Sequence, residues 1–309
     1  MTVRLISCVG VRNDLAMLPH FLRHYLALDV PAANMHIITQ ASEPCPELEV
    51  ADRIIREYRL PSAERWLAPY TSDTMWEKRR EVQRRYAADN DWVVSADVDE
   101  LHEYPASLAE VFAWCDRRGV NCIQGPFIDR LALEGRLAEI APEPSMERQF
   151  PIQADVICSI RGGAREPGFK YGTVKVMALK GDLMPSRGGH HPRSDGTAPV
   201  YLAGQALADF KLITQPFFRF ANPFKVHHYK WVASLLKGTS ERLSTPGVSV
   251  AGKIYGEQLM GYFEREPRVR MTDISVRSPA IWAKVSWRTT IEIMRSMAKV
   301  EVNLRKLRR

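Results

Sequence analysis

The sequence has no hydrophobic run long enough to cross a bilayer. Its first apolar stretch, Val3 to Val9, spans seven residues, whereas a transmembrane helix needs about 20. The N-terminus also lacks a basic segment followed by an apolar one, so no secretory signal is predicted. The five cysteines are odd in number, widely spaced and without a CxxC pair, which argues against a disulfide framework or a zinc knuckle. Together these absences predict a cytoplasmic protein.

Several signature motifs are also missing. The chain contains no GxGxxG, no GxxxxGK[ST] and no GxSxG, so dinucleotide, P-loop and serine-hydrolase chemistry lack their usual sequences. Net positive charge is concentrated at the C-terminus: of a net charge of +7, residues 280–309 contribute +6, from eight basic residues against two acidic ones. A nucleic-acid footprint spread over the body is therefore disfavoured, and no nucleic-acid partner is expected.

What the first half does contain is an alternation of strand-like and helix-like patterns. In chain order these predict strand 3–9, helix 14–28, strand 35–39, strand 53–60, helix 73–88, strand 92–96, helix 107–117 with Ser107 as N-cap, and strand 121–128. This rhythm is typical of an α/β fold with a Rossmann-like, mostly parallel sheet flanked by helices.

The second half is less regular. It predicts strands at 173–179 and 225–231, a helix near 232–237, and a long basic helix that begins at Ser278-Pro279. The basic run Lys78-Arg79-Arg80 and Arg84-Arg85 on helix 73–88 is expected to form a solvated face, with an approach to a diphosphate as the alternative.

Acidic residues gather directly after the buried strand Trp92–Ala96, in Asp97-Val98-Asp99-Glu100. Ligands collect at the carboxyl ends of strands in open α/β sheets. Neighbouring carboxylates there repel one another unless a cation lies between them, and Mg²⁺ or Mn²⁺ prefers such oxygen ligands together with substrate phosphates. The sequence therefore predicts a divalent-metal site, and the alternative is a solvated acidic turn.

Three ordered motifs carry a family resemblance. The run Trp92 to Leu101 resembles the W-x-x-x-x-D-x-D-E-[FL] signature of GT-A glycosyltransferases of the family-2-like group. The opening from Val9 to Tyr25, with Arg12-Asn13-Asp14, is similar to the start of that group, and Val226 to Trp231 is similar to its late H-[HY]-[FY]-[KR] element. Together the motifs cover roughly residues 3–235.

The resemblance implies a GT-A catalytic domain over residues 1–275. Its nucleotide-sugar half would be about 1–130 and its acceptor half about 131–275, followed by a basic helical tail at 276–309. It further implies metal-dependent transfer, with inversion, of a sugar from a nucleotide-diphosphate donor such as a UDP-sugar to a glycan or lipid-linked acceptor. The implied cofactor is Mn²⁺ or Mg²⁺.

The resemblance also suggests roles for individual residues. Asp97 would face the ribose or the metal and Asp99 would ligate the metal. Arg12, Asn13 and Asp14 would lie on the donor, although Asp14 could instead cap the following helix. A late histidine would complete the metal site: His228 is the first choice, then His227, then His191 of the His190-His191 pair. Lys230 would pair with phosphate oxygens.

An inverting transferase also needs a general base, normally a carboxylate. The family's E-D element is absent here, which leaves this assignment open between Asp129, just past a strand end, and Glu147. Asp129 could equally form a salt bridge to Arg130 or to another arginine.

Two other functions stay open at the sequence level. One is a metal-dependent phospho- or nucleotidyltransferase built on Asp97 and Asp99, and the other is a non-catalytic binding module with a basic tail. In that tail, apolar residues recur at helical spacing, at Ile293, Met297, Val300, Leu304 and Leu307. Such a stripe either packs on the catalytic domain or a second subunit, or lies on an anionic membrane surface, which would make the protein peripheral at the inner face of the membrane.

Overall fold

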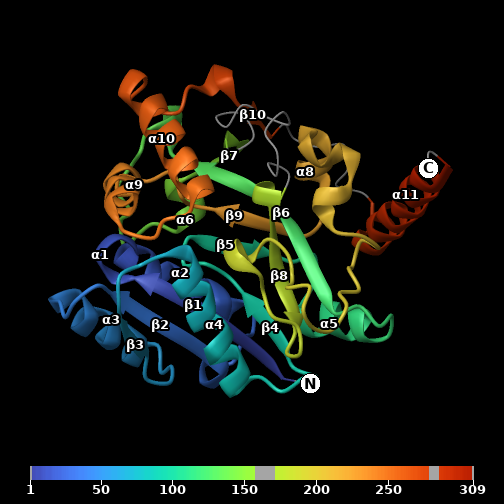
Figure 1. Cartoon of the computed structure of the whole chain (residues 1–309), viewed down its shortest axis with the longest axis horizontal. Helices are drawn as coiled ribbons and strands as arrows, with labels where there is room; N and C mark the ends of the chain where they lie inside the picture. Colours follow the sequence, from blue (N-terminus) through green and yellow to red (C-terminus); the bar gives the residue numbers. More distant parts are fainter. Residues whose placement is uncertain (1, 157–170, 278–284, 308–309) are drawn as a thin grey trace.

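The computed structural model describes residues 2–156, 171–277 and 285–307. It is an α/β fold in which helices flank a curled sheet (Figure 1). The strands are β1 (Val3–Gly10), β2 (Met35–Ala41), β3 (Glu64–Leu67), β4 (Trp92–Ser95), β5 (Glu100–Glu103), β6 (Cys122–Leu131), β7 (Ile152–Asp155), β8 (Val174–Lys180), β9 (Lys225–His228) and β10 (Ser275–Val276). The α-helices are α1 (Val11–Asp14), α2 (Leu18–Ala27), α3 (Pro46–Glu57), α4 (Ser72–Tyr86), α5 (Leu108–Asp116), α6 (Met146–Gln149), α8 (Pro216–Ala221), α9 (Leu235–Ser244), α10 (Val250–Arg265) and α11 (Trp287–Leu307).

The sheet runs in the order β10-β7-β6-β8-β4-β1-β2-β3. Strands β4, β1, β2 and β3 are parallel to one another, which gives the Rossmann-like half that the sequence predicts. Strand β8 then lies antiparallel between β4 and β6, and a short pair, β5 and β9, joins the sheet through β6. The structure therefore confirms the α/β class, and its four adjacent parallel strands come from the first half of the chain.

Most predicted elements lie where their patterns place them. Ser107 caps α5 by accepting a hydrogen bond from the Glu110 amide at 3.3 Å, as expected. The four residues of β4 and all ten of β6 are buried, which is typical of strands covered on both faces. The late helix begins at Leu235, within the predicted range 232–237, and extends to Ser244, beyond the predicted end.

One element differs in type. Residues 53–60, predicted as a strand from their Ile-Ile pair, belong mostly to helix α3. Pro46 stands in the first turn of this helix with Glu47 and Glu49, which suits the positive end of the helix dipole, and Leu48, Ala51 and Ile55 form its buried face. The third parallel strand is instead β3, a few residues later.

The basic run on α4 also differs from its prediction. Arg84 and Arg85 are about half exposed, as a solvated face requires, but Arg79 and Arg80 are buried. The buried side of α4 repeats at helical spacing through Met75, Trp76, Arg79, Val82 and Gln83. Arg79 therefore points into the protein because it occupies the middle of the apolar face.

The C-terminal helix α11 is present and begins at Trp287. The predicted start at Ser278-Pro279, together with Lys284, Arg308 and Arg309, lies outside the described residues. The helix is docked on the body through Ile291, Met294 and Ala298, all nearly inaccessible. Across the described chain, no helix combines the length and apolar character that a membrane crossing demands.

Candidate functional site

A cleft of about 580 Å³ lies at the carboxyl ends of β1 and β4. Because these two strands are parallel neighbours, the residues that follow them meet at one edge of the sheet. The segment after β1 contributes Arg12, Asn13 and Asp14, and the segment after β4 contributes Asp97 and Asp99. The opposite wall comes from the second half of the chain, with residues 228–230 and helix α9.

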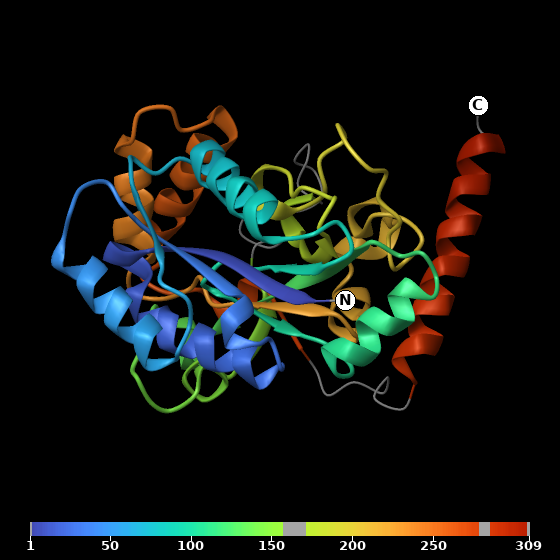
Figure 2. The same ribbon diagram turned by 90° about the horizontal axis from the view of Figure 1, so that it is seen from below.

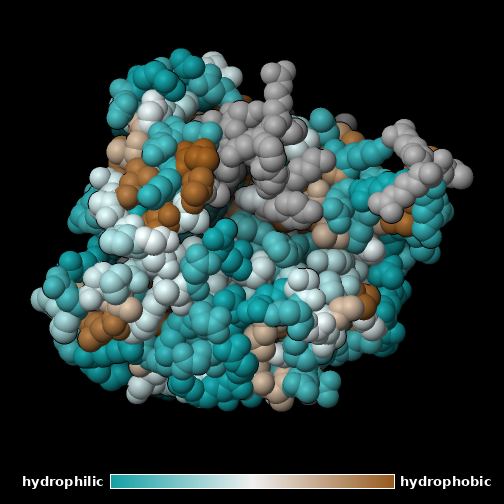
Figure 3. All heavy atoms as spheres, in the orientation of Figure 1, coloured by the Kyte–Doolittle hydropathy of each residue, from teal (hydrophilic) through white to brown (hydrophobic). Residues whose placement is uncertain are grey.

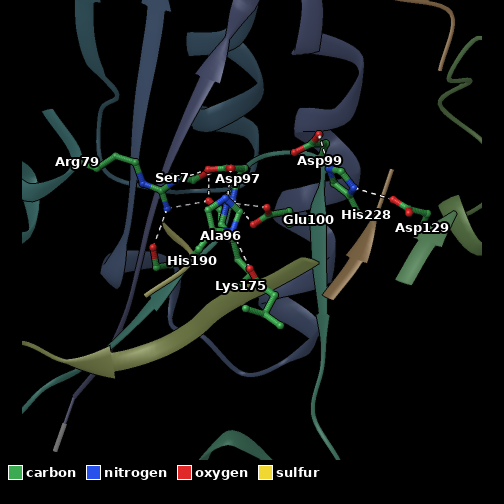
Figure 4. A network of polar contacts seen from close by, with 12 residues as sticks. Ser7, Arg79, Ala96, Asp97, Asp99, Glu100, Asp129, Lys175, His190 and His228 are labelled. Carbon is green, nitrogen blue, oxygen red and sulfur yellow. Dashed lines mark hydrogen bonds and ion pairs between the residues drawn. The ribbon is translucent and has the colours of Figure 1, made fainter. Parts of the chain in front are cut away.

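Asp97 is held by two cations (Figure 4). The guanidinium of Arg79 donates to one carboxylate oxygen of Asp97, and the Nζ of Lys175 donates to the other at 2.6 Å. The same Nζ lies 2.7 Å from Glu100, whose second oxygen accepts the backbone N–H of Asp97 at 3.0 Å. Since Arg79, Lys175 and Glu100 are almost fully buried, this network fixes the backbone that carries the acidic motif.

The ring of Trp76 supports both cations. The guanidinium carbon of Arg79 lies 4.2 Å from the ring centroid and the Nζ of Lys175 lies 5.2 Å from it. Gly189, with a φ of +66°, packs against this ring, and a Cβ there would come within 2.4 Å of it. The Gly188-Gly189 pair therefore serves close packing behind the acidic motif.

The network separates the pKa values of the two acids. Burial by itself would raise the pKa of Asp97, but Lys175 and Arg79 outweigh it and lower that pKa below its ordinary range. Burial and the charge of Asp97 raise the pKa of Glu100 to about 7. Asp97 is therefore a fixed negative charge at neutral pH, whereas Glu100 titrates close to it.

A second chain of contacts runs from Asp99 into the core. The Nε2 of His228 lies 3.6 Å from a carboxylate oxygen of Asp99, and its Nδ1 lies 2.9 Å from Asp129. Asp129 is inaccessible and also accepts hydrogen bonds from the Trp231 indole and the Val156 amide, each at 2.9 Å. Burial alone would lower the pKa of His228, but Asp129 and Asp99 outweigh it and raise that pKa.

The four histidines that the sequence singled out have different surroundings in the structure. His227 and His228 are neighbours on β9, so their side chains point to opposite faces. The Nε2 of His227 lies 2.8 Å from a carboxylate oxygen of Glu103. The Nδ1 of His190 lies 2.7 Å from the Val174 carbonyl oxygen, and burial together with Lys175 lowers the pKa of His190 to about 4. Of the four, His228 lines the cleft beside the acidic motif. His191 does not line this cleft, and burial lowers its pKa.

The opening motif lines the cleft as expected. Asp14 makes no capping hydrogen bond to the turn that follows it, and burial, with Asp99 and Asp97 nearby, raises its pKa to about 7. Arg12 pairs with Glu43 at 2.9 Å, and Asn13 donates to Glu241 of α9 at 2.9 Å.

The two carboxylates considered as a general base lie elsewhere. Asp129 is behind His228 with both oxygens accepting hydrogen bonds, which suits a residue that orients the imidazole. Glu147 lines a separate hollow of about 240 Å³ together with His20 and His24. Lys230 does line the cleft, where its Nζ donates to the hydroxyl of Tyr255 at 2.7 Å.

Sequence reasoning missed Arg79 and Lys175 as members of the site. The signal for Arg79 was its place within the apolar spacing of α4. The signal for Lys175 was a cation that precedes the apolar run Val176–Leu179 of strand β8, where its burial demands a negative partner. Which acid would supply that partner depended on the antiparallel placement of β8 beside β4.

The arrangement fits a divalent cation at one place. Within the described residues, Asp97, Asp99 and Glu100 each present a ligand oxygen, all within 4.8 Å of one another. Because Lys175 already occupies the space between Asp97 and Glu100, the open donors are those of Asp99 and the Nε2 of His228. A histidine whose other nitrogen is held by a buried carboxylate is a common arrangement at metal sites.

Comparison with known proteins gives little beyond this geometry. No family model matches the chain, and no curated protein matches it. Among solved structures, S. aureus TarS 1–349 has a TM-score of 0.36 and 12% identity, over 86% of this chain and 73% of that one. A second S. aureus TarS structure has a TM-score of 0.35 and 11% identity, over 88% of this chain and 44% of that one. Likeness at this level assigns no activity to the chain.

Proposed function

We propose that this protein is a metal-dependent glycosyltransferase. It moves a sugar from a nucleotide-diphosphate donor, a UDP-sugar, to a glycan or lipid-linked acceptor with inversion. The observation that carries the proposal is the meeting of Asp97, Asp99 and His228 with Arg12–Asp14 at one end of a cleft. The three sequence motifs that resemble the family-2-like GT-A group thus converge on one site.

Asp99 and His228 are the residues that would hold Mn²⁺ or Mg²⁺. When bound, the ion acts as a Lewis acid that neutralises charge on the departing nucleotide diphosphate. The chain's own contribution is to orient these ligands: Asp129 fixes the imidazole through Nδ1, and Arg79 and Lys175 fix the Asp97 carboxylate. In this proposal Asp97 faces the ribose, since both of its oxygens already have cationic partners.

The opening motif supplies the donor-binding wall. With a pKa of about 7, Asp14 is a carboxyl group that both donates and accepts hydrogen bonds near neutral pH, which suits a pyrimidine or ribose edge. Arg12, Lys230 and Arg242 line the same cleft and offer positive charge to phosphate oxygens.

The proposal of a lipid-linked acceptor rests on an exposed apolar surface. Helix α10 exposes Val250 and Ile254, and hydrophobic side chains gather over α9 and α10 in the space-filling view (Figure 3). Because α9 forms one wall of the cleft, an apolar surface there would suit an acceptor with a lipid portion.

A donor screen by thermal shift tests the proposal. We expect UDP and UDP-sugars to stabilise the protein only when Mn²⁺ or Mg²⁺ is present, with the cleft variant Asp14→Ala reducing the shift. A nucleotide-release assay over several NDP-sugars should then show metal-dependent turnover. Metal binding with no release from any sugar donor would instead favour a phospho- or nucleotidyltransferase. No thermal shift with any nucleotide would contradict an enzyme of either kind.

The pH dependence of donor binding tests His228. Only the neutral imidazole offers a lone pair at Nε2, and the pKa of His228 is raised above the ordinary value of about 6.5. Metal-dependent nucleotide binding should therefore weaken as the pH falls, beginning above pH ~6.5. Asp129→Asn should lower the midpoint, because the imidazolium loses its charged partner, and should weaken metal affinity by about 10–100-fold.

Matched variants control this experiment. His228→Ala should remove the part of the pH dependence that comes from the imidazole, whereas His227→Ala, whose Nε2 contacts Glu103, should keep it. Isothermal titration of Mn²⁺ and UDP across the pH range gives the midpoints. An unchanged midpoint in Asp129→Asn would show that this carboxylate does not act through His228.

A further inference from the structure

Lys230 enters the cleft from a fixed point beside the acidic motif. It follows the end of β9 by two residues, and the backbone N–H of its neighbour Tyr229 donates to the carbonyl of Asp99 at 2.8 Å. The ammonium group, however, stands on a flexible four-carbon stem, which loses much conformational freedom when an anion holds it in one place. A group that already holds the ammonium in position would therefore reduce the cost of binding that anion.

Tyr255 of α10 makes two contacts with this ammonium group. The Nζ of Lys230 donates to the Tyr255 hydroxyl at 2.7 Å and lies 4.3 Å from the centroid of the same ring. The hydroxyl oxygen and the ring face both attract a cation. Tyr255 does not line the cleft itself, whereas Lys230 does.

The two contacts leave the charge of Lys230 in place. Across the described parts of the chain, no carboxylate forms an ion pair with Lys230. Arg12, another cation of the cleft, differs because its guanidinium pairs with Glu43 at 2.9 Å. A hydroxyl and an aromatic ring fix an ammonium group without neutralising it as a carboxylate would. The charge of Lys230 is thus held in position for an anionic ligand.

The helix that carries this tyrosine is packed on both neighbouring segments. Gly256 lies against α9, where a Cβ would come within 2.8 Å of the Leu243 side chain. Further along α10, the ring centroid of Phe263 is 6.5 Å from that of Trp231, the residue after Lys230. In Figure 2, α9 and α10 (orange) lie together at the end of the molecule opposite α11 (red). Both partners of the contact therefore belong to one packed unit at the cleft.

We infer that Tyr255 is a positioning residue, which directs the ammonium group of Lys230 toward the β-phosphate of a nucleoside diphosphate. The inference rests on the proposed function, in which Lys230 meets the donor's phosphates. Lys230 is two residues from His228, so its charge lies at the end of the cleft where the diphosphate would meet the metal. The cleft should therefore prefer a nucleoside diphosphate to the monophosphate, and this preference should depend on Tyr255.

Isothermal titration of the full chain with UDP and with UMP, each with Mn²⁺, tests the inference. We expect the wild type to bind UDP more tightly than UMP. Tyr255→Phe keeps the ring and removes the hydroxyl, so it should weaken UDP binding by about 5–10-fold and UMP binding by less than about twofold. Tyr255→Leu removes the ring as well and should weaken UDP binding further.

A double-mutant cycle shows whether the effect passes through Lys230. Lys230→Met should weaken UDP binding at least as much as Tyr255→Phe, and Lys230→Met/Tyr255→Phe should be no weaker than Lys230→Met alone. Tyr262→Phe is the matched control on the same helix, because the Tyr262 hydroxyl accepts the Arg270 amide at 3.0 Å instead. This control should bind UDP as the wild type does, and thermal unfolding checks that each variant is folded.

Three results would overturn the inference. Equal losses of UDP and UMP affinity in Tyr255→Phe, or additive losses in the double variant, would mean that the tyrosine only supports the fold. Tighter UDP binding in Tyr255→Phe would mean that the tyrosine withdraws Lys230 from the ligand. In all three the wild type still binds UDP, whereas a wild type that binds no nucleotide contradicts the proposed function, and the inference fails with it.

Discussion

Replacing Asp99 by asparagine is expected to abolish metal-dependent nucleotide binding and to reduce turnover by about 10²–10³-fold. The amide keeps the shape of the side chain but removes the charge that a hard divalent cation requires. The fold should survive, because the Asp99 side chain is 31% exposed at the end of the acidic motif and is not part of the Arg79–Lys175 network.

Isothermal titration of UDP with and without Mn²⁺ measures this effect. Asp195→Asn is a suitable control, since Asp195 is an exposed carboxylate that pairs with Arg193 away from the cleft. If Asp99→Asn binds UDP in the presence of metal as the wild type does, the assignment of Asp99 as a ligand is wrong.

Lys175→Met should lower the free energy of unfolding by about 3–5 kcal/mol. The change removes a buried cation that contacts both Asp97 and Glu100, and it leaves the almost inaccessible Glu100 without this cationic partner. The pKa of Glu100 is already raised to about 7, so a proton can replace part of the lost interaction as the pH falls. The loss should therefore be larger at pH 8 than at pH 6.

Urea denaturation at both pH values measures this loss. Lys180→Met on the same strand is the matched control: Lys180 is less buried and pairs with Asp116 at 2.8 Å, so its cost should stay near or below about 1 kcal/mol. Lys175→Met/Glu100→Gln should recover part of the stability, because it removes the unpaired charge as well. Equal losses in Lys175→Met and Lys180→Met would mean that the buried network contributes little.

The local hydrophobic pattern was sufficient to predict the type of the buried strands. Strands β1, β4 and β6 lie inside the sheet, so apolar residues predominate in their sequences and their type is clear. It failed for α3, where the Ile54-Ile55 pair resembles a strand while the wider spacing of Leu48, Ala51 and Ile55 is helical. Two neighbouring β-branched residues are a weaker indicator than a buried face that repeats over two turns.

The sequence alone determined three of the four parallel strands, β1, β2 and β4, and the end of β4 as the place of the acidic motif. It also placed Arg12–Asp14 at the same edge, because parallel strands carry their carboxyl ends to one side. Tertiary structure decided the rest. Only the placement of β8 beside β4, and of β9 between β5 and β6, brought Lys175 to Asp97 and His228 to Asp99, and buried Asp129 behind the imidazole. These contacts join residues about 80–130 positions apart in the chain. No local periodicity encodes which distant partner a buried charge will meet, because that depends on the order of strands in the sheet.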